Sequence, residues 1–149
     1  MSGNQLHGGG VPPDIAASLD SGPALRTIAM PADANPNGDI FGGWILSQMD
    51  LAGGTAAKRR AKGRVATVGI EAMSFHQPVL IGDEVSCFAT VEKVGRTSIR
   101  VLVETWARRP ADQGAAEEVV KVTQGLFTFV AIDDQRRPRP VPPEDGTQE

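Results

Sequence analysis

The sequence predicts an α+β fold in which one antiparallel sheet curls around one central helix. Residues 44–60 repeat apolar side chains at helical spacing, and four stretches with strand-like alternation follow them, joined by short turns. A chain of 149 residues with 40% hydrophobic content is long enough for one core, so we expect a single domain. Because one helix cannot cover a sheet of such long strands, we also expect two protomers to pair.

The predicted domain spans residues 23–134 and lies between two flexible tails. Residues 1–22 mix glycine, proline and small polar residues without periodicity, so they cannot bury enough apolar surface to offset the entropy lost on ordering. Residues 135–149 contain prolines that exclude both helix and central strand: Pro138, Pro140, Pro142 and Pro143. The sequence therefore predicts that both ends are loose and dispensable.

The composition argues against several functional classes. A net charge of -3, without clustered basic and aromatic residues, does not suit a nucleic-acid surface. The N-terminus lacks an apolar run that could serve as a signal peptide or a membrane span, so we expect a cytoplasmic protein without membrane contact. The one cysteine, Cys87, forbids an internal disulfide, and together with His7 and His76 it does not make a plausible zinc site. We therefore expect no metal.

The elements are expected in the order strand, helix and four further strands. A short strand at residues 25–30 leads into turns around Asn35 and Gly38, and the helix follows. The long strands are expected at residues 65–75, 84–94, 99–108 and 119–132.

Local geometry is also predicted for three of these strands. Between the second and third long strands, Gly95-Arg96 makes a hairpin turn. Gly125 interrupts the last strand, which predicts a bend or a bulge there. In the first long strand, alternation places apolar residues on one face and polar residues on the other: Val68, Ile70 and Ala72 against Thr67 and Glu71.

The helix carries an acidic residue at an unusual place. One stripe of apolar side chains predicts its buried face: Ile45, Met49, Ala52 and Ala56. Asp50 sits at the border of that stripe, about 140° from Ile45 on the helical wheel, and too deep in the helix to act as an N-cap. The residues beside it on the helix surface are small: Gly53, Gly54 and Ala57. A simpler interpretation stays open, in which Asp50 is solvated and the glycines only allow close packing.

The start of the helix offers hydrogen-bond donors. Gly42 and Gly43 place unhindered backbone N–H groups where a helix N-terminus has unpaired donors and a positive potential. A developing oxyanion needs such donors. A carboxylate base and an oxyanion site together predict attack of water on a carbonyl, with Asp50 as the base.

The residues around the helix start are similar to a known family signature. They read Asp33-Ala-Asn35-x-x-Gly38-x-x-Phe41-Gly42-Gly43-x-x-Leu46-Ser47-x-Met49-Asp50. Further segments fall in the order and spacing of the same family: Gly63-Arg64-Val65, Phe75-x-x-Pro78-Val79, Gly82-Asp83, Val94-Gly95-Arg96-Thr97-Ser98 and Phe127-Thr128-Phe129-Val130-Ala131-x-Asp133. From about residue 25 to residue 133, the chain resembles the YciA-type hotdog-fold acyl-CoA thioesterases, a family of acyl-CoA thioester hydrolases.

The resemblance implies a hotdog fold and hydrolysis of fatty acyl-CoA to free acid and coenzyme A. Asp50 would then activate water or attack the thioester itself, while the Gly42 and Gly43 amides hold the oxyanion. In two-domain relatives the residue matching Asn35 pairs with the residue matching Asp50 across the site, which implies that Asn35 positions a reactant. Those relatives often carry His where this chain has Phe41, so a role for that histidine does not transfer.

The resemblance also implies where coenzyme A is held and how chains assemble. In this family the nucleotide end of the substrate binds at the positions that match Arg96, Thr97 and Ser98. Their guanidinium and hydroxyl groups suit a phosphate. A basic cluster after the helix can attract the same anion or simply complement the helix dipole: Lys58, Arg59, Arg60, Lys62 and Arg64. Coenzyme A enters only as part of the substrate, with no further cofactor. The family forms homodimers, which can assemble into a hexamer as a trimer of dimers.

Alternatives to thioester hydrolysis stay open. A hotdog enoyl-CoA hydratase usually pairs Asp with His, and no helix-borne His stands near Asp50. A non-catalytic acyl-CoA-binding module would lack the carboxylate or carry a DNA-binding domain. A Ser-His-Asp triad would need His76 as its base, but no serine lies in a nucleophile-elbow motif. We expect His76 at a strand end, as a polar wall near the site.

Overall fold

The part of the chain that the structure describes contains one five-stranded sheet and one long helix. The computed structural model describes residues 12–15 and 21–144, so most of the predicted N-terminal tail and residues 145–149 lie outside the described residues. In chain order the elements are β1 (Leu25–Ile28), the 3-10 turn η2 (Pro31–Asp33), α2 (Gly42–Ala61), β2 (Val65–Phe75), β3 (Glu84–Val94), β4 (Ser98–Arg109) and β5 (Glu118–Ala131). The helix and all five strands were predicted, and their bounds differ from the prediction by at most two residues.

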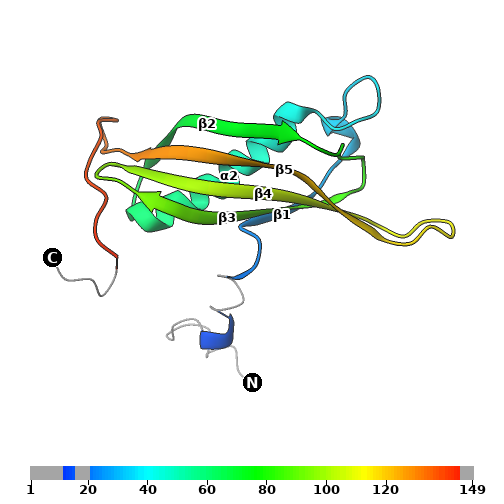
Figure 1. Ribbon diagram of the computed structural model, residues 1–149, viewed down its shortest axis with the longest axis horizontal. Coiled ribbons are helices and arrows are strands. Elements are labelled where there is room, and N and C mark those ends of the chain that lie inside the picture. Colours follow the sequence, from blue (N-terminus) through cyan, green and yellow to red (C-terminus); the bar gives the residue numbers. More distant parts are fainter. Residues whose placement is uncertain (1–11, 16–20, 145–149) are drawn as a thin grey trace.

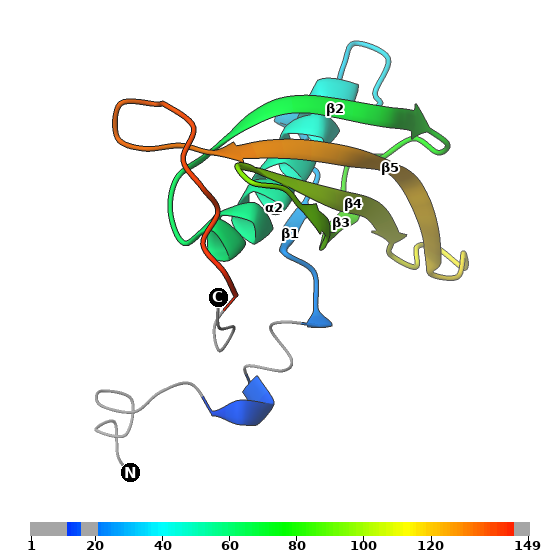
Figure 2. The same ribbon diagram turned by 60° about the vertical axis from the view of Figure 1, so that its left-hand side comes forward.

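The strands pair antiparallel throughout, in the order β1-β3-β4-β5-β2. The sheet curves so that α2 lies along its concave side (Figures 1 and 2). β3, β4 and β5 run consecutively as hairpin neighbours, while β2 forms one edge and β1 the other. This arrangement confirms the predicted antiparallel sheet around a single central helix.

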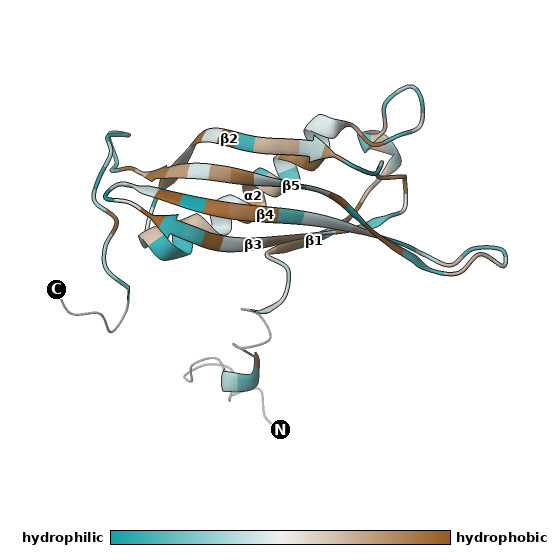
Figure 3. Cartoon of the chain, viewed as in Figure 1, coloured by the Kyte–Doolittle hydropathy of each residue, from teal (hydrophilic) through white to brown (hydrophobic). Residues whose placement is uncertain are grey.

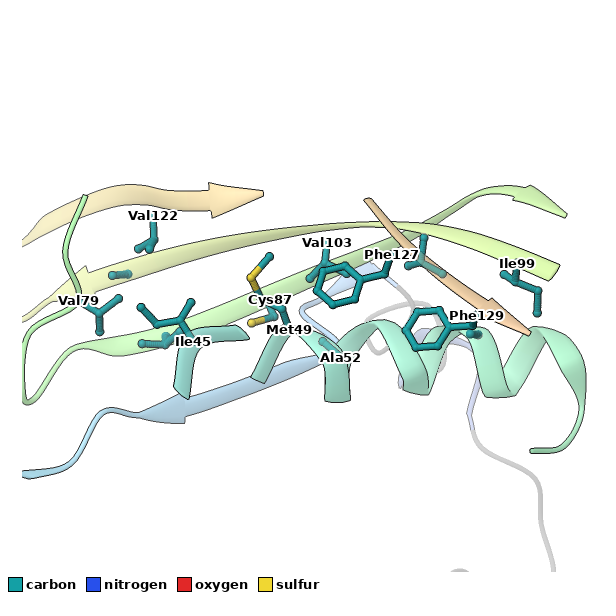
Figure 4. Close-up of a cluster of buried hydrophobic side chains, with 14 of the residues drawn as sticks. Ile45, Met49, Ala52, Val79, Cys87, Ile99, Val103, Val122, Phe127 and Phe129 are labelled. Carbon is teal, nitrogen blue, oxygen red and sulfur yellow. The ribbon is translucent and has the colours of Figure 1, made fainter. Parts of the chain in front are cut away.

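The core fills the space between α2 and the concave face of the sheet. Ile45, Met49 and Ala52 on the helix are buried against Phe127 and Phe129 of β5 (Figure 4). The predicted stripe is confirmed at these positions, whereas Ala56 is only partly buried and the helix turns Gly53, Ala57 and Ala61 inward instead. Figure 3 shows the hydrophobic central strands and the hydrophilic last turn of α2.

Close packing explains the first of the two helix glycines. A Cβ on Gly53 would lie 3.1 Å from Phe129 Cζ and 3.1 Å from Val103 Cγ2, tighter than ordinary carbon contacts. Gly53 therefore lets α2 lie closer to the sheet than a residue with a Cβ would allow without a shift of these neighbours. Gly54 is less constrained, because its Cβ would lie 3.6 Å from Phe129 Cε1.

The predicted faces of β2 hold for Ile70 and Glu71 and are wrong for Thr67 and Val68, because the strand contains a bulge between Thr67 and Gly69 and a second one further on. Thr67 pairs with Phe129 and Ile70 pairs with Phe127, although Ile70 lies three positions after Thr67 and the two partners lie only two positions apart. Paired residues of antiparallel strands point to the same face, so both Thr67 and Ile70 face the helix side. The extra residue at the first bulge, Val68, is 59% exposed. Each one-residue insertion reverses the alternation that follows it.

Gly125 does not itself bulge, contrary to the prediction. It stays in register with Val103, while the second bulge lies opposite it in β2, between Glu71 and Ser74. Ala72 has the left-handed φ of 57° there, and Met73 packs where a Gly125 side chain would stand. A separate irregularity in β5 lies between Lys121 and Thr123. Gly125 thus makes room for a neighbouring strand's side chain.

The described part of the predicted C-terminal tail is bound to the body of the protein, which corrects the expectation for residues 135–144. The Arg139 N–H donates to Ala131 O over 2.9 Å, and the Val141 N–H donates to Arg96 O over 2.8 Å. The Arg60 guanidinium donates to Pro142 O over 2.6 Å. Prolines do exclude helix and central strand, but the residues between them keep their N–H donors, and proline carbonyls still accept hydrogen bonds.

No helix within the described residues combines the length and the apolar character needed to cross a membrane.

A buried ion pair fixes the loop that follows β2. Asp83 is 1% exposed, and Arg109 donates to it from Nε over 3.0 Å and from Nη2 over 2.9 Å. The Leu80 N–H also donates to Asp83, over 2.9 Å. The hydrogen bonds that Arg109 donates to Asp83 raise the pKa of Arg109, against a smaller opposing effect of burial. The pair anchors the turn before β3 to the end of β4.

Replacing Asp83 by Ala should therefore lower the free energy of unfolding by about 3 kcal/mol, because it removes the buried carboxylate that accepts from Arg109 Nε and Nη2 and from the Leu80 N–H. Urea titration followed by circular dichroism measures this change. Arg108→Ala is the matched control, since Arg108 pairs with Glu84 and Glu117 at an exposed position and its loss should cost less than about 1 kcal/mol. Equal effects of the two substitutions would contradict the anchoring role of Asp83.

Candidate active site

Asp50 lies midway along α2 at the edge of its buried face. Thr67 of β2 donates from Oγ1 to Asp50 Oδ1 over 2.6 Å. Both side chains line a pocket of about 280 Å³, whose other walls include Gly54, Lys58, Val65 and Phe129. The half-buried carboxylate is thus held by one hydroxyl and open to a pocket, as its place on the helical wheel predicted.

The local sequence explains how Asp50 comes to this position. Met49 and Ala52 are fully buried, so they fix the rotation of α2 and leave Asp50 at the border. Gly54 adds no side chain beside the carboxylate and lines the same pocket. The first bulge of β2 turns Thr67 toward the helix, within hydrogen-bond distance of Asp50.

The first turn of α2 presents two unused backbone donors. The Trp44 and Ile45 N–H groups both donate to Phe41 O, over 3.1 and 3.3 Å. Within the described residues, the N–H groups of Gly42 and Gly43 have no acceptor. Both glycines are exposed, and nothing lies within 4 Å of the place where a Gly43 side chain would begin. These donors can bind an anion or a polarised carbonyl oxygen.

Gly42, the first of these two residues, lines a second pocket, of about 340 Å³. The pocket is also lined by Ile45, Phe75, His76 and Val79, among others. His76 therefore stands just after a strand end beside the helix start, as predicted, and outside the pocket that contains Asp50. The two pockets share no lining residue. Asp50 follows Gly43 by seven residues, which is about 10 Å along a helix axis.

Asn35 shapes the loop before the helix. Its Oδ1 accepts from the Asn37 N–H over 2.9 Å and from the Asp39 N–H over 3.1 Å. Two N–H donors on one side-chain atom identify that atom as the oxygen rather than the nitrogen. The structure gives Asn35 no contact with Asp50 of the same chain within the described residues. No hydrogen bond from its amide NH₂ group is formed within the described residues.

The turn of Arg96, Thr97 and Ser98 lies beyond the Asp50 pocket, across one strand. Val65 lines that pocket and pairs with Ala131, whose N–H donates to Thr97 O over 2.8 Å. The Gly95 N–H closes the turn onto Ser98 O over 2.8 Å. The carbonyls of Arg96 and Thr97 are thus occupied, whereas the Arg96 side chain is exposed. The turn is a neighbour of the pocket and not part of its wall.

Two residues of the Asp50 pocket were not predicted as site residues. Thr67 was placed on the face away from the helix, because the bulge at Val68 has no signature in the apolar alternation. Lys58 was grouped with the basic residues after the helix, yet it lines the pocket two turns beyond Asp50. The i+4 spacing of Asp50, Gly54 and Lys58 is the signal that could have identified it.

Other chemistry finds no support in the geometry. Cys87 is fully buried, and burial raises the pKa of its thiol while a hydrogen bond with Thr105 opposes that shift. A buried, protonated thiol is a poor nucleophile. Within residues 12–15 and 21–144, no three His, Cys, Asp or Glu side chains gather so that they could hold a metal ion. The groups that the described residues do offer are the Asp50 carboxylate at its pocket and the two unpaired N–H donors at the start of α2.

Comparison with known proteins identifies the family. The thioesterase superfamily model matches residues 37–112. The acyl-CoA thioester hydrolase YciA of Escherichia coli (strain K12) is 48% identical over 120 residues, which cover 80% of this chain and 90% of that protein. A hexameric hotdog fold thioesterase of Campylobacter jejuni has a TM-score of 0.78 at 43% identity, with 82% of this chain and 91% of that one covered. A hexameric thioesterase of Yersinia pestis has a TM-score of 0.77 at 45% identity, with 82% of this chain and 97% of that one covered. The chain therefore belongs to the thioesterase superfamily, among the hotdog-fold acyl-CoA thioester hydrolases of the YciA type.

Proposed function

We propose that the protein hydrolyses the thioester of fatty acyl-CoA to a free acid and coenzyme A, with Asp50 as the catalytic carboxylate. The observation that supports it is the geometry of one helix. Asp50 is held by Thr67 at an open pocket, and the same helix begins with two unpaired N–H donors. Membership of a family of acyl-CoA thioester hydrolases supports the substrate class.

In the proposed reaction Asp50 takes a proton from water as the water attacks the thioester carbon, or it attacks that carbon itself. In either route the carbonyl oxygen becomes an oxyanion, which the Gly42 and Gly43 amides stabilise. The carbon–sulfur bond then breaks and coenzyme A leaves as a thiolate, which takes up a proton. Thr67 keeps the carboxylate oriented, and the Asn35 amide donates to water or to the carbonyl.

We infer that each site combines residues of two chains. A thioester carbon needs its base and its oxyanion donors within about 3 Å of the reacting atoms, but Asp50 and Gly43 of one chain are about 10 Å apart along the helix. Two antiparallel helices related by a two-fold axis would bring Asp50 of one chain to Asn35, Gly42 and Gly43 of the other.

The exposed side of β2 suits such a pairing. β2 is an edge strand of 11 residues, so a row of its backbone groups is available to a second chain. Val68 on this strand is 59% exposed, and Leu51, next to Asp50, is 58% exposed. We propose that a second copy covers this apolar surface. The hexameric relatives of Campylobacter jejuni and Yersinia pestis support further assembly of such dimers into a trimer of dimers.

The function is tested by acyl-CoA hydrolysis, followed through release of the coenzyme A thiol. Asp50→Ala and Asp50→Asn should lower kcat by about a hundredfold or more and leave KM and the circular dichroism spectrum largely unchanged. Thr67→Val keeps the shape of the side chain and removes the hydroxyl, so it should lower kcat about tenfold. Near wild-type thiol release by either Asp50 variant would show that Asp50 is an ordinary solvated residue.

The two-chain site is tested by mixing inactive variants. Asn35→Asp keeps the oxygen acceptor for the loop and removes the amide donor, so it should fold normally, and Asp50→Asn removes the base. Each homodimer should be nearly inactive. In a mixed dimer, one site has both native residues and the other has neither. Random pairing makes half of the dimers mixed, and the mixture should regain about a quarter of wild-type activity.

Differently tagged chains and tandem purification verify that mixed dimers are present. A verified mixture that stays as inactive as its two parents would show that Asn35 and Asp50 serve the same chain's site.

The nucleotide contact is tested at Arg96. Arg96→Ala should raise KM for acyl-CoA about tenfold and change KM for the corresponding acyl-pantetheine little, because only acyl-CoA carries the nucleotide phosphates. Arg108→Ala, which removes an equal charge from an exposed position on β4, is the control and should affect both substrates equally. If Arg96→Ala also affects both equally, Arg96 does not contact the nucleotide.

A further inference from the structure

The pocket at the start of α2 has the chemistry of an apolar binding site. Its floor consists of Ile40, Ile45 and Val79, which are at most 5% exposed. His76 and Gln77 stand exposed at its rim. Gly42 also lines it, so the pocket begins where the unpaired N–H donors of the helix are located. An acyl group whose carbonyl oxygen binds those donors would find an apolar surface directly beside its first methylenes.

One wall of this pocket is the ring of Phe75. Its Cζ and Cε2 atoms lie 3.8 and 4.0 Å from the position that a Cβ on Gly42 would occupy, so the ring stands beside the helix start at the distance where a side chain on Gly42 would touch it. Half of Phe75 is nevertheless exposed. A large aromatic side chain that is ordered against the site and still open to a ligand is suited to shape that ligand's path.

The second bulge of β2 aims Phe75 at this pocket. Phe75 is paired with Thr123, which is fully buried on the helix side of the sheet, whereas Ser74 is paired with the exposed Gln124. If the same sequence paired with β5 without a bulge between Glu71 and Ser74, Ser74 would point inward and Phe75 would point outward. The left-handed Ala72 and the space above Gly125, into which Met73 packs, make that insertion possible.

We propose that Phe75 determines which acyl groups the enzyme accepts, by walling the pocket that receives the acyl chain. The inference rests on the proposed function and adds the chemical class of the group bound at this end of the site. That group is an aliphatic chain, because the floor offers only hydrocarbon side chains and the polar residues lie at the rim. Bulges beside active sites commonly re-aim a side chain in this way.

The proposal predicts how kcat/KM depends on the length of the acyl chain. Each methylene that enters the pocket should raise kcat/KM about fourfold until the chain reaches the Phe75 ring. Removing the ring extends the pocket, and enlarging it shortens the pocket. The ratio of kcat/KM for long acyl chains to that for short ones should therefore move in opposite directions in Phe75→Ala and Phe75→Trp, by about tenfold in each case.

The experiment measures kcat/KM for straight-chain acyl-CoA from propanoyl to dodecanoyl, and for the branched isobutyryl-CoA, with the full-length wild type and the variants. Phe75→Leu keeps an apolar side chain and should give a smaller shift in the same direction as Phe75→Ala, which protects the test against misfolding of the Ala variant. Val119→Ala is the matched control, because Val119 is similarly exposed, at 53%, and lies on β5 away from the pocket. Size-exclusion chromatography checks that all variants keep the wild-type assembly.

Opposite shifts in Phe75→Ala and Phe75→Trp, with an unchanged profile in Val119→Ala, support the proposal. Chain-length profiles that stay parallel to the wild type in all Phe75 variants overturn it. Including Asp50→Ala in the same series distinguishes a failure of the proposed role of Phe75 from a failure of the proposed hydrolytic function. If wild type is active, Asp50→Ala is inactive and the Phe75 profiles are parallel, then only the role of Phe75 fails. If wild type hydrolyses no acyl-CoA, the proposed function itself fails.

Discussion

The close contact of α2 with the sheet is the constraint on which the geometry around Asp50 depends. Gly53 lies so close to Phe129 and Val103 that a Cβ there would stand only 3.1 Å from each of them. Met49 and Ala52, which precede it and are fully buried, fix the rotation of the helix. Because the Thr67–Asp50 hydrogen bond spans the gap between helix and sheet at 2.6 Å, a small outward shift of α2 would break it. Packing in the core thus sets the orientation of the carboxylate.

Most of the fold could be predicted from local pattern, and the faces of Thr67 and Val68 in β2 could not. Alternation and helical spacing report how each segment is buried, so they give the elements and nearly all of their ends. The register of β2 depends on β5, more than 50 residues further along the chain, and both Val68 and Ile70 are apolar, so the first bulge leaves no trace in the alternation. Thr67 was missed for this reason, although Asp50 and the helix-start glycines could be identified from the sequence.

The wrong prediction of a loose C-terminal tail arose because the prolines were judged by the N–H donors that they lack. Prolines between residues 135 and 144 remove N–H donors, but Arg139 and Val141 retain theirs and bind Ala131 and Arg96. Asn35 likewise carries two different groups. Its oxygen is satisfied within the loop, which is the ordinary structural use of Asn in a turn, and its amide is separate from that use. A turn residue can therefore also be a site residue.

One helix provides both halves of the proposed chemistry at places that a single chain cannot bring together. The carboxylate sits in one pocket and Gly42, which offers one of the oxyanion donors, lines another, and the rise of the helix between them is fixed by its hydrogen bonds. A two-fold axis is the simplest symmetry that brings the oxyanion donors of one chain to the carboxylate of the other. The same operation would cover Leu51 and the exposed edge of β2 and so remove water from around Asp50, which strengthens every electrostatic interaction there. In such a protein the assembly of chains and the formation of the active site are the same event.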